Sequence, residues 1–228
     1  MDIKIEIQEF IDKNKDEKRA ELDRLSVSTK YEIQGIKTQL LQDCAKQLAK
    51  ENVNIKDLPL DFHEEIILAG FVIAYKNYSF KEKEKDLKYL FKYIDNWYSC
   101  DLIASRLKNM ESEHEFFEGL LFDDNPFVIR FAIIWMMKFM LKVDLKRTVC
   151  KLREVKNTTY YVQMALSTCY TEAFLYDFDY MYEFIETVPR TVVRNRALQK
   201  ACVSTRITQE QKVLIKKLRS RLLGMEIL

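Results

Sequence analysis

Glycine and proline are scarce in this chain, with 4 glycines and 3 prolines among 228 residues. Both residue types mark tight turns, and a β-rich fold needs many such turns between its strands. Helices joined by short connections need few of them. The scarcity therefore predicts an all-α protein, and the length is sufficient to bury a continuous core.

The spacing of apolar residues is helical along most of the chain. In residues 38–51, for example, apolar residues recur on one face, namely Leu41, Cys44, Ala45 and Leu48. Residues 61–76 become almost wholly apolar after Asp61, which we expect to cap a helix buried between neighbours. Further helices are predicted over residues 81–94, 97–108, 112–122, 127–141, 144–155, 158–174, 177–188, 190–206 and 208–223.

Two features of the helix pattern indicate the architecture. Residues 3–7 alternate like a strand, but no second strand is predicted to pair with them, so we expect a helix there as well. Helix pairs recur roughly every 35–45 residues without a linker between them. This pattern predicts a single domain over residues 1–228, a HEAT-like α-solenoid built as a curved stack of antiparallel helix pairs.

Composition excludes several classes of protein. The longest apolar run, residues 127–141, is too short to cross a bilayer and contains Arg130 and Lys138, so we expect no contact with a membrane. The 5 cysteines are scattered and there are only 2 histidines, which predicts neither a disulfide framework nor a metal site. The sequence has no glycine-rich phosphate loop, so we expect no cofactor. We expect a monomer in a reducing cytoplasm.

Charge is distributed unevenly although the net charge is only +2. From Arg190 onward the chain has ten basic residues and two acidic ones, which gives +8 for this part and −6 for the rest. Such a segment is suited to meeting a polyanion. It is equally typical of a solvated basic helix, and charge alone leaves both interpretations open.

Trp97 and Asp101 stand four residues apart in the predicted helix over 97–108. On a helical wheel they lie on the flank of an apolar stripe formed by Cys100, Ile103, Ala104 and Leu107. Because Asp95 or Asn96 can cap this helix, Asp101 is not needed as a cap. It is either a functional carboxylate beside an aromatic ring or an ordinary surface acid near a helix start.

Several stretches, in a shared order, resemble the DNA alkylation repair family of HEAT-like proteins. They are "EIQGIKT" (32–38), "HEEIILAGFVIAY" (63–75), "NWYSCDLIASRLK" (96–108), "NPFVIRFAIIWMMKFML" (125–141) and "VRNRALQKACVSTRIT" (193–208). The third stretch matches the Trp-x-x-x-Asp segment of that family with Trp97 and Asp101. The fourth places Arg130 where the family has an arginine before an apolar run.

The resemblance implies a DNA glycosylase that removes cationic N3- and N7-alkylated purines from double-stranded DNA. Asp101 would stabilise positive charge on the deoxyribose and position a water molecule, and Trp97 would pack against the sugar. Arg130 would hold a backbone phosphate. The family grips DNA from the backbone side, without the tight base pocket of base-flipping enzymes. Further expected phosphate contacts are Lys37, Arg106, Lys108, Arg194 and Lys200.

One departure from the family pattern keeps other functions open. Thr168 stands where active members carry a second tryptophan, and the other tryptophan of this chain, Trp135, is expected to lie in the core. The alternatives are a catalytically inactive member that binds bent or branched DNA and, from another class, a protein–protein scaffold. Salt-dependent binding to DNA would separate the scaffold from the DNA-binding proteins. A DNA-bound protein would associate with the nucleoid.

Overall fold

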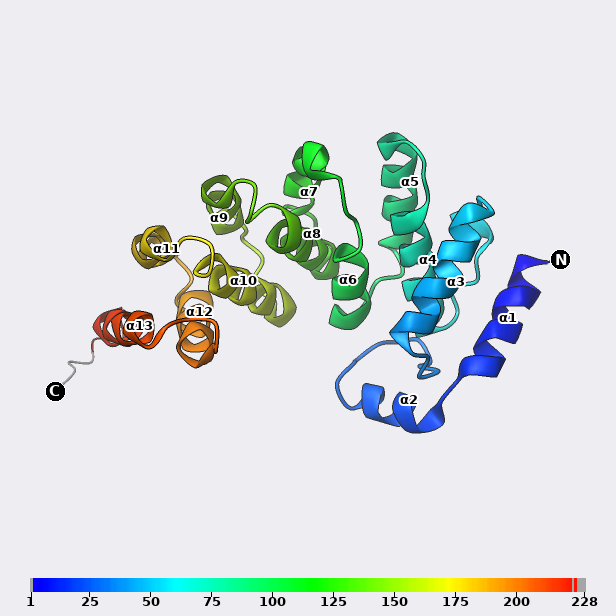
Figure 1. Cartoon of the computed structure of the whole chain (residues 1–228), viewed down its shortest axis with the longest axis horizontal. Helices are drawn as coiled ribbons and strands as arrows, with labels where there is room; N and C mark the ends of the chain where they lie inside the picture. The colour runs from blue at the N-terminus through cyan, green and yellow to red at the C-terminus, as the bar shows by residue number, and fades with distance from the viewer. Residues whose placement is uncertain (1, 223, 225–228) are drawn as a thin grey trace. The chain divides into compact units, whose positions relative to one another are not determined.

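The computed structural model describes residues 2–222 and residue 224 (Figure 1). Within this range the structure is helical and has no β-sheet, and one isolated bridge joins Glu32 to Phe62. The elements are α1 (Ile3–Asn14), α2 (Glu17–Arg24), α3 (Thr38–Lys50), η1 (Ile55–Asp57), α4 (His63–Tyr75), α5 (Phe80–Leu90), α6 (Trp97–Ala104), η2 (Glu111–Glu113), α7 (His114–Leu120), α8 (Pro126–Phe139), α9 (Leu145–Arg153), α10 (Tyr160–Ala173), α11 (Phe178–Phe184), η3 (Ile185–Thr187), α12 (Thr191–Val203) and α13 (Gln209–Leu222). The all-α prediction is confirmed.

The chain folds into two compact units, residues 1–110 and residues 111–228. We call them the N-terminal unit and the C-terminal unit and describe each by itself. The single domain over residues 1–228 stays a prediction.

The N-terminal unit is organised around α4, which packs against α3, α5 and α6. This helix is buried from His63 to Ile73, as its apolar sequence predicts. Gly70 allows the close approach of α6, because a Cβ atom at Gly70 would lie 2.4 Å from Cγ1 of Ile103. The helix that carries Trp97 is therefore seated directly on the most buried helix of the unit.

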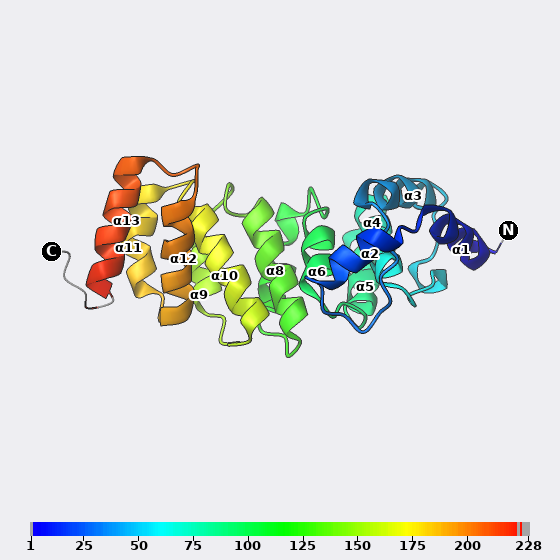
Figure 2. The same cartoon turned by 90° about the horizontal axis from the view of Figure 1, so that it is seen from below.

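The C-terminal unit has two layers of helices (Figure 1). The helices α8, α10 and α12 lie side by side in one layer, with α10 between the other two (Figure 2). Helix α7 packs on α8, α9 and α11 pack on α10, and α13 packs on α12. Trp135 is fully buried and stacks on Phe117 with 3.6 Å between ring centroids, so its expected place in the core is confirmed. Packing between successive helices is consistent with the predicted α-solenoid.

Most helices begin and end close to the predicted positions, but those predicted over residues 81–94 and 97–108 end earlier, at Leu90 and Ala104, and α2 was not predicted. Residues 3–7 belong to α1, so the helical prediction is right there. Asp61, however, does not cap α4. The helix begins at His63, and the carboxylate of Glu65 reaches back to accept hydrogen bonds from the backbone N–H groups of Asp61 (2.7 Å) and Phe62 (2.9 Å). A glutamate in the first turn thus replaces the expected cap.

The apolar segments are short in comparison with a bilayer. No helix in the part of the chain that the structure describes is long and apolar enough to cross a membrane.

Candidate functional site

Helix α6 begins at a side-chain cap. The buried Asn96 accepts hydrogen bonds from the backbone N–H groups of Tyr98 and Ser99, both at 3.0 Å. Asparagine is among the residue types that best cap a helix in this way. The cap fixes Trp97 as the first residue of the helix.

Trp97 is half-buried and anchored to a distant part of the N-terminal unit. Its indole N–H donates a hydrogen bond of 3.0 Å to the carbonyl of Ser26, 71 residues earlier in the chain. Its ring packs against a small apolar cluster of Ala20, Val27 and Ile33. The nitrogen edge of the ring is therefore held in place by the segment that follows α2, in addition to any role that Trp97 has at a site.

The segment over residues 26–37 is itself fastened by a buried carboxylate. Glu64, at the start of α4, accepts hydrogen bonds from the backbone N–H groups of Gln34 (3.0 Å), Gly35 (2.7 Å) and Ile36 (3.3 Å). Burial raises the pKa of Glu64, and the backbone hydrogen bonds counteract part of this rise. The bonds are those of an anion-binding turn, in which the anion is a side chain of the protein itself.

A second carboxylate and a glycine complete this attachment. Asp95, just before α6, accepts hydrogen bonds from the Thr29 hydroxyl (2.8 Å) and from the backbone N–H of Lys30 (2.9 Å). Gly35 has φ +72°, and a Cβ atom there would lie 2.2 Å from the carbonyl oxygen of Asp16. Only glycine fits this turn, which brings the 26–37 segment against the start of α2.

Asp101 lies on the flank of α6 and is partly buried. Its neighbours Cys100, Ile103 and Ala104 are fully buried, as the helical wheel predicts. The hydroxyl of Ser105 donates to the backbone carbonyl of Asp101 at 2.6 Å, at the end of the helix. Asp101 therefore sits beside the buried stripe and is itself only partly buried.

The predicted phosphate contacts of the N-terminal unit differ in their surroundings. Lys37 and Lys108 are exposed and accessible to a large anion. Arg106 is partly buried, with its guanidinium 5.7 Å from the centre of the Phe71 ring. This cation–π contact orders the Arg106 side chain.

In the C-terminal unit, the predicted phosphate contact Arg130 is only 8% exposed. Its Nη1 group donates a hydrogen bond of 2.9 Å to the backbone carbonyl of Tyr161 on α10. Arg194 is partly buried, and its Nε has no hydrogen-bond partner among the described residues. Arg130 and Arg194 are thus both less exposed to solvent than a fully exposed surface arginine.

Lys200 on α12 has a defined partner on α10. Its ammonium donates a hydrogen bond of 2.6 Å to the hydroxyl of Thr168, which in turn donates to the backbone carbonyl of Met164 at 2.9 Å. Burial lowers the pKa of Lys200, and the charges of Arg130 and Arg196 lower it further. Thr168, the departure from the family pattern, is therefore the residue that holds a lysine.

Arg196 belongs to the same group of residues, although the sequence interpretation did not select it. Its Nη1 lies 3.0 Å from the sulfur of Met164, and its guanidinium lies 5.5 Å from the centre of the Tyr160 ring. Arg196 and Lys200 are four residues apart on α12, a spacing that puts both on one helix face. That spacing is the signal by which the pair could have been found.

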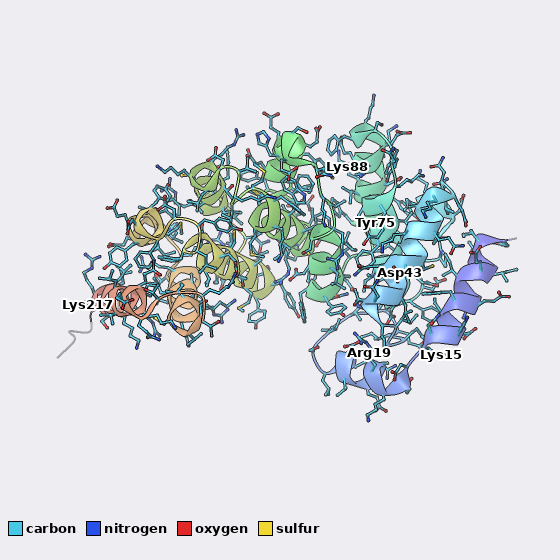
Figure 3. The ribbon with its side chains drawn as sticks, viewed as in Figure 1. Lys15, Arg19, Asp43, Tyr75, Lys88 and Lys217 are labelled. Atoms are coloured by element: carbon cyan, nitrogen blue, oxygen red, sulfur yellow. The ribbon has the colours of Figure 1, made fainter. Side chains whose placement is uncertain are left out.

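A hollow of about 630 Å³ in the N-terminal unit does not include the predicted site. It lies at the ends of α3 and α4, where Lys46, Lys50 and Lys76 surround Tyr75, which is labelled in Figure 3. None of the residues that line it was predicted from the sequence.

The structure places the predicted site residues in two groups, one in each unit. The N-terminal unit holds Lys37, Trp97, Asp101, Arg106 and Lys108, and the C-terminal unit holds Arg130, Arg194 and Lys200. Basic side chains are therefore present in both units. The fold itself defines the protein as an all-helical protein built from packed helix layers.

The family follows from the sequence comparison. A family model described as DNA alkylation repair enzyme matches residues 7–203, well over half of the chain. The protein belongs to this family, as its motifs indicated, and membership supports a role in DNA repair. No curated protein and no solved structure matches the chain significantly.

Proposed function

We propose that the protein is a DNA glycosylase that hydrolyses the N-glycosidic bond of cationic N3- or N7-alkylated purines in duplex DNA. The proposal is carried by one observation within the family framework: Trp97 and Asp101 stand one turn apart on α6, with Trp97 held in a fixed position. The enzyme would act as a monomer without a cofactor, at the nucleoid in the cytoplasm.

The chemistry requires little more than charge stabilisation. An alkylated purine already carries a positive charge, so the electron pair of the glycosidic bond leaves readily with the base, which becomes neutral. Positive charge then develops on the deoxyribose, and the carboxylate of Asp101 stabilises it and orients the water that attacks C1′. The ring of Trp97 adds a cation–π contribution of about 0.5–2 kcal/mol.

Binding of the duplex would come from basic residues in both units. Lys37 and Lys108 are exposed and suited to backbone phosphates, and Arg106, Arg194 and Lys200 would add contacts. Arg130 would bind a phosphate close to α10, since its guanidinium is hydrogen-bonded to a backbone carbonyl of that helix. Such binding weakens steeply with salt, because each phosphate contact releases counterions.

The deciding experiment measures release of 7-methylguanine and 3-methyladenine from methylated duplex DNA. We expect release by the wild-type protein and a loss of roughly 100- to 1,000-fold in Asp101→Asn, the size typical of removing one electrostatic stabiliser. Asp179→Asn, which changes an exposed aspartate at the start of α11, is the matched control and should retain wild-type release. Equal release by Asp101→Asn and the control would remove Asp101 from the mechanism.

A second function is favoured by Thr168. Where active family members carry a tryptophan, this chain has a threonine whose hydroxyl is bonded to Lys200. A site that has exchanged an aromatic wall for a fixed cation is suited to binding DNA phosphates instead of a cationic base. If the wild-type protein releases no base but shifts duplex DNA in a salt-sensitive manner, the protein is a DNA-binding member of the family without glycosylase activity.

A further inference from the structure

Two cations on α12 are held in place by neutral groups of α10. Lys200 donates to the hydroxyl of Thr168 at 2.6 Å, and Arg196 lies 3.0 Å from the sulfur of Met164 with its guanidinium over the Tyr160 ring. Neutral acceptors fix a cation without cancelling its charge. The two side chains are therefore ordered, and the groups that hold them carry no negative charge.

Within the described residues, neither Arg196 nor Lys200 forms an ion pair with a carboxylate. The acid one turn beyond Thr168 on α10, Glu172, pairs with Arg206 instead. Burial and the nearby charges of Arg130 and Arg196 lower the pKa of Lys200, as expected for an ammonium that has no anion beside it. An anionic ligand would reduce the repulsion between the charges of Arg196 and Lys200.

We propose that Arg196 and Lys200, with Lys200 positioned by Thr168, form a binding site for a phosphate dianion. A phosphate monoester carries close to two negative charges at neutral pH, whereas a backbone diester carries one. Two ordered cations favour the more highly charged group, and the guanidinium fork of Arg196 matches phosphate oxygens. The ligand class is a terminal phosphate, as at a DNA strand end, and free phosphate shares its chemistry.

This site goes beyond the proposed glycosylase, because excision at an internal lesion requires only diesters of an unbroken strand. It is also independent of that function. Binding of a terminal phosphate is measured without any lesion and without turnover, so it can be present in a protein that releases no base.

The test compares two nicked duplexes of the same sequence, one with a 5′-phosphate at the nick and one with a 5′-hydroxyl, by fluorescence anisotropy. We expect the wild-type protein to bind the phosphorylated nick about tenfold more tightly, the effect of one charge-assisted contact pair. Lowering the pH from about 7.5 to about 5 should abolish the preference, because the second pKa of the monoester is about 6.

Variants identify the residues that cause the preference for the phosphorylated nick. Lys200→Met and Arg196→Gln should each bring the two affinities to within about twofold of each other, while Lys217→Ala, which removes an exposed charge on α13, should keep the wild-type ratio (Figure 3). Thr168→Val, which removes only the positioning hydroxyl, should lower the ratio to an intermediate value. Circular dichroism of each variant confirms that it is folded.

Inorganic phosphate distinguishes the two sources of the ligand. If it binds the wild-type protein but not Lys200→Met, and the nick phosphate gives no preference, the site stands and its ligand is a free phosphate. Equal affinity of the wild-type protein for both nicks, together with no binding of inorganic phosphate that depends on Lys200, overturns the proposal. Base release by the same samples reports separately on the glycosylase.

Discussion

In the N-terminal unit the buried carboxylate of Glu64 accepts hydrogen bonds from three backbone N–H groups, whereas in the C-terminal unit the ammonium of Lys200 donates to a threonine hydroxyl. The first charge is satisfied by the chain itself and holds a turn in place. The second is positioned but not neutralised. The comparison teaches that a charge enclosed by backbone donors serves folding, while a charge held by neutral side chains remains available for binding.

The strongest test of the first half of this comparison is Gly35→Ala. The new Cβ atom would overlap the carbonyl of Asp16 in a backbone conformation with φ +72°, so the turn bound by Glu64 has to open. We expect a loss of about 3 kcal/mol or more in the free energy of unfolding, measured by urea denaturation. Gly119→Ala, where a Cβ atom meets open space in α7, is the control and should stabilise the protein by about 0.5–1 kcal/mol.

Acid should weaken the same region through His63. This residue is 2% exposed, and burial lowers its pKa to about 4, while the charge of Asp95 acts in the opposite direction. Between about pH 6.5 and pH 4 the unfolded chain binds a proton that the native protein does not, so stability present at neutral pH is lost as the pH falls.

The loss from His63 should approach roughly 3 kcal/mol at pH 4. The raised pKa of Glu64 has the opposite sign and opposes it, so the informative quantity is the difference between wild type and His63→Gln. Unfolding free energies measured across this pH range should show a shallower dependence in His63→Gln. Parallel curves for wild type and His63→Gln would contradict the assignment.

Glu64→Gln addresses the carboxylate directly. The amide has nearly the same shape, but its NH₂ group would face backbone N–H donors that need an acceptor. We expect a loss of about 1–3 kcal/mol in the free energy of unfolding, with increased hydrogen exchange at Gln34, Gly35 and Ile36. Unchanged protection at these three amides would show that the backbone bonds to Glu64 are not what holds the turn.

Trp97→Phe removes the hydrogen bond that anchors the ring but keeps an aromatic ring at this position. Phenylalanine retains an aromatic face but lacks the N–H group that bonds to Ser26. The free energy of unfolding should fall by about 1 kcal/mol, the typical value of one hydrogen bond together with a small loss of packing. Base release, if the protein is a glycosylase, should fall less than in Trp97→Ala. An equal fall in both variants would mean that the fixed position of the ring matters more than its aromatic face.

The smallest effect on stability is expected at Lys200. Because its ammonium is partly desolvated beside other cations, Lys200→Met should change the free energy of unfolding by no more than about 0.5 kcal/mol, in either direction. Thermal unfolding is a sufficient measurement. A loss as large as that of Glu64→Gln would erase the distinction between the two regions, since Lys200 would then serve folding as well.

Much of this fold could be predicted from the sequence, because turn residues are few and apolar spacing marks the buried helix faces. The stripe beside Asp101 and the burial of Trp135 follow from that spacing. The Asp61 cap was wrong because α4 begins only at His63, and the N–H of His63, which an Asp61 cap could bond, donates instead to the carbonyl of Glu32 at 3.0 Å. Periodicity reports which face of a helix is buried, but it does not report which carboxylate satisfies which donor.

The site residues show the same limit. Motif resemblance selected Trp97 and positive charge selected Lys200, yet their partners, Ser26 and Thr168, are 71 and 32 residues away in the chain. Contacts of this kind depend on how helices pack, and one sequence without its fold does not specify them. Arg196 was overlooked although its position relative to Lys200 could have revealed it.

The hydrogen bond between Trp97 and Ser26 also bears on the order in which the parts of the chain fold. It joins residues 71 positions apart, and Glu64 holds the same segment from 29 positions beyond Gly35. During synthesis, residues 26–37 therefore emerge long before their partners exist, and contacts of such separation form late. The start of α6 acquires its final arrangement only after the helices between Ser26 and Trp97 have packed. We therefore expect residues 26–37 to be among the last parts of the N-terminal unit to become ordered.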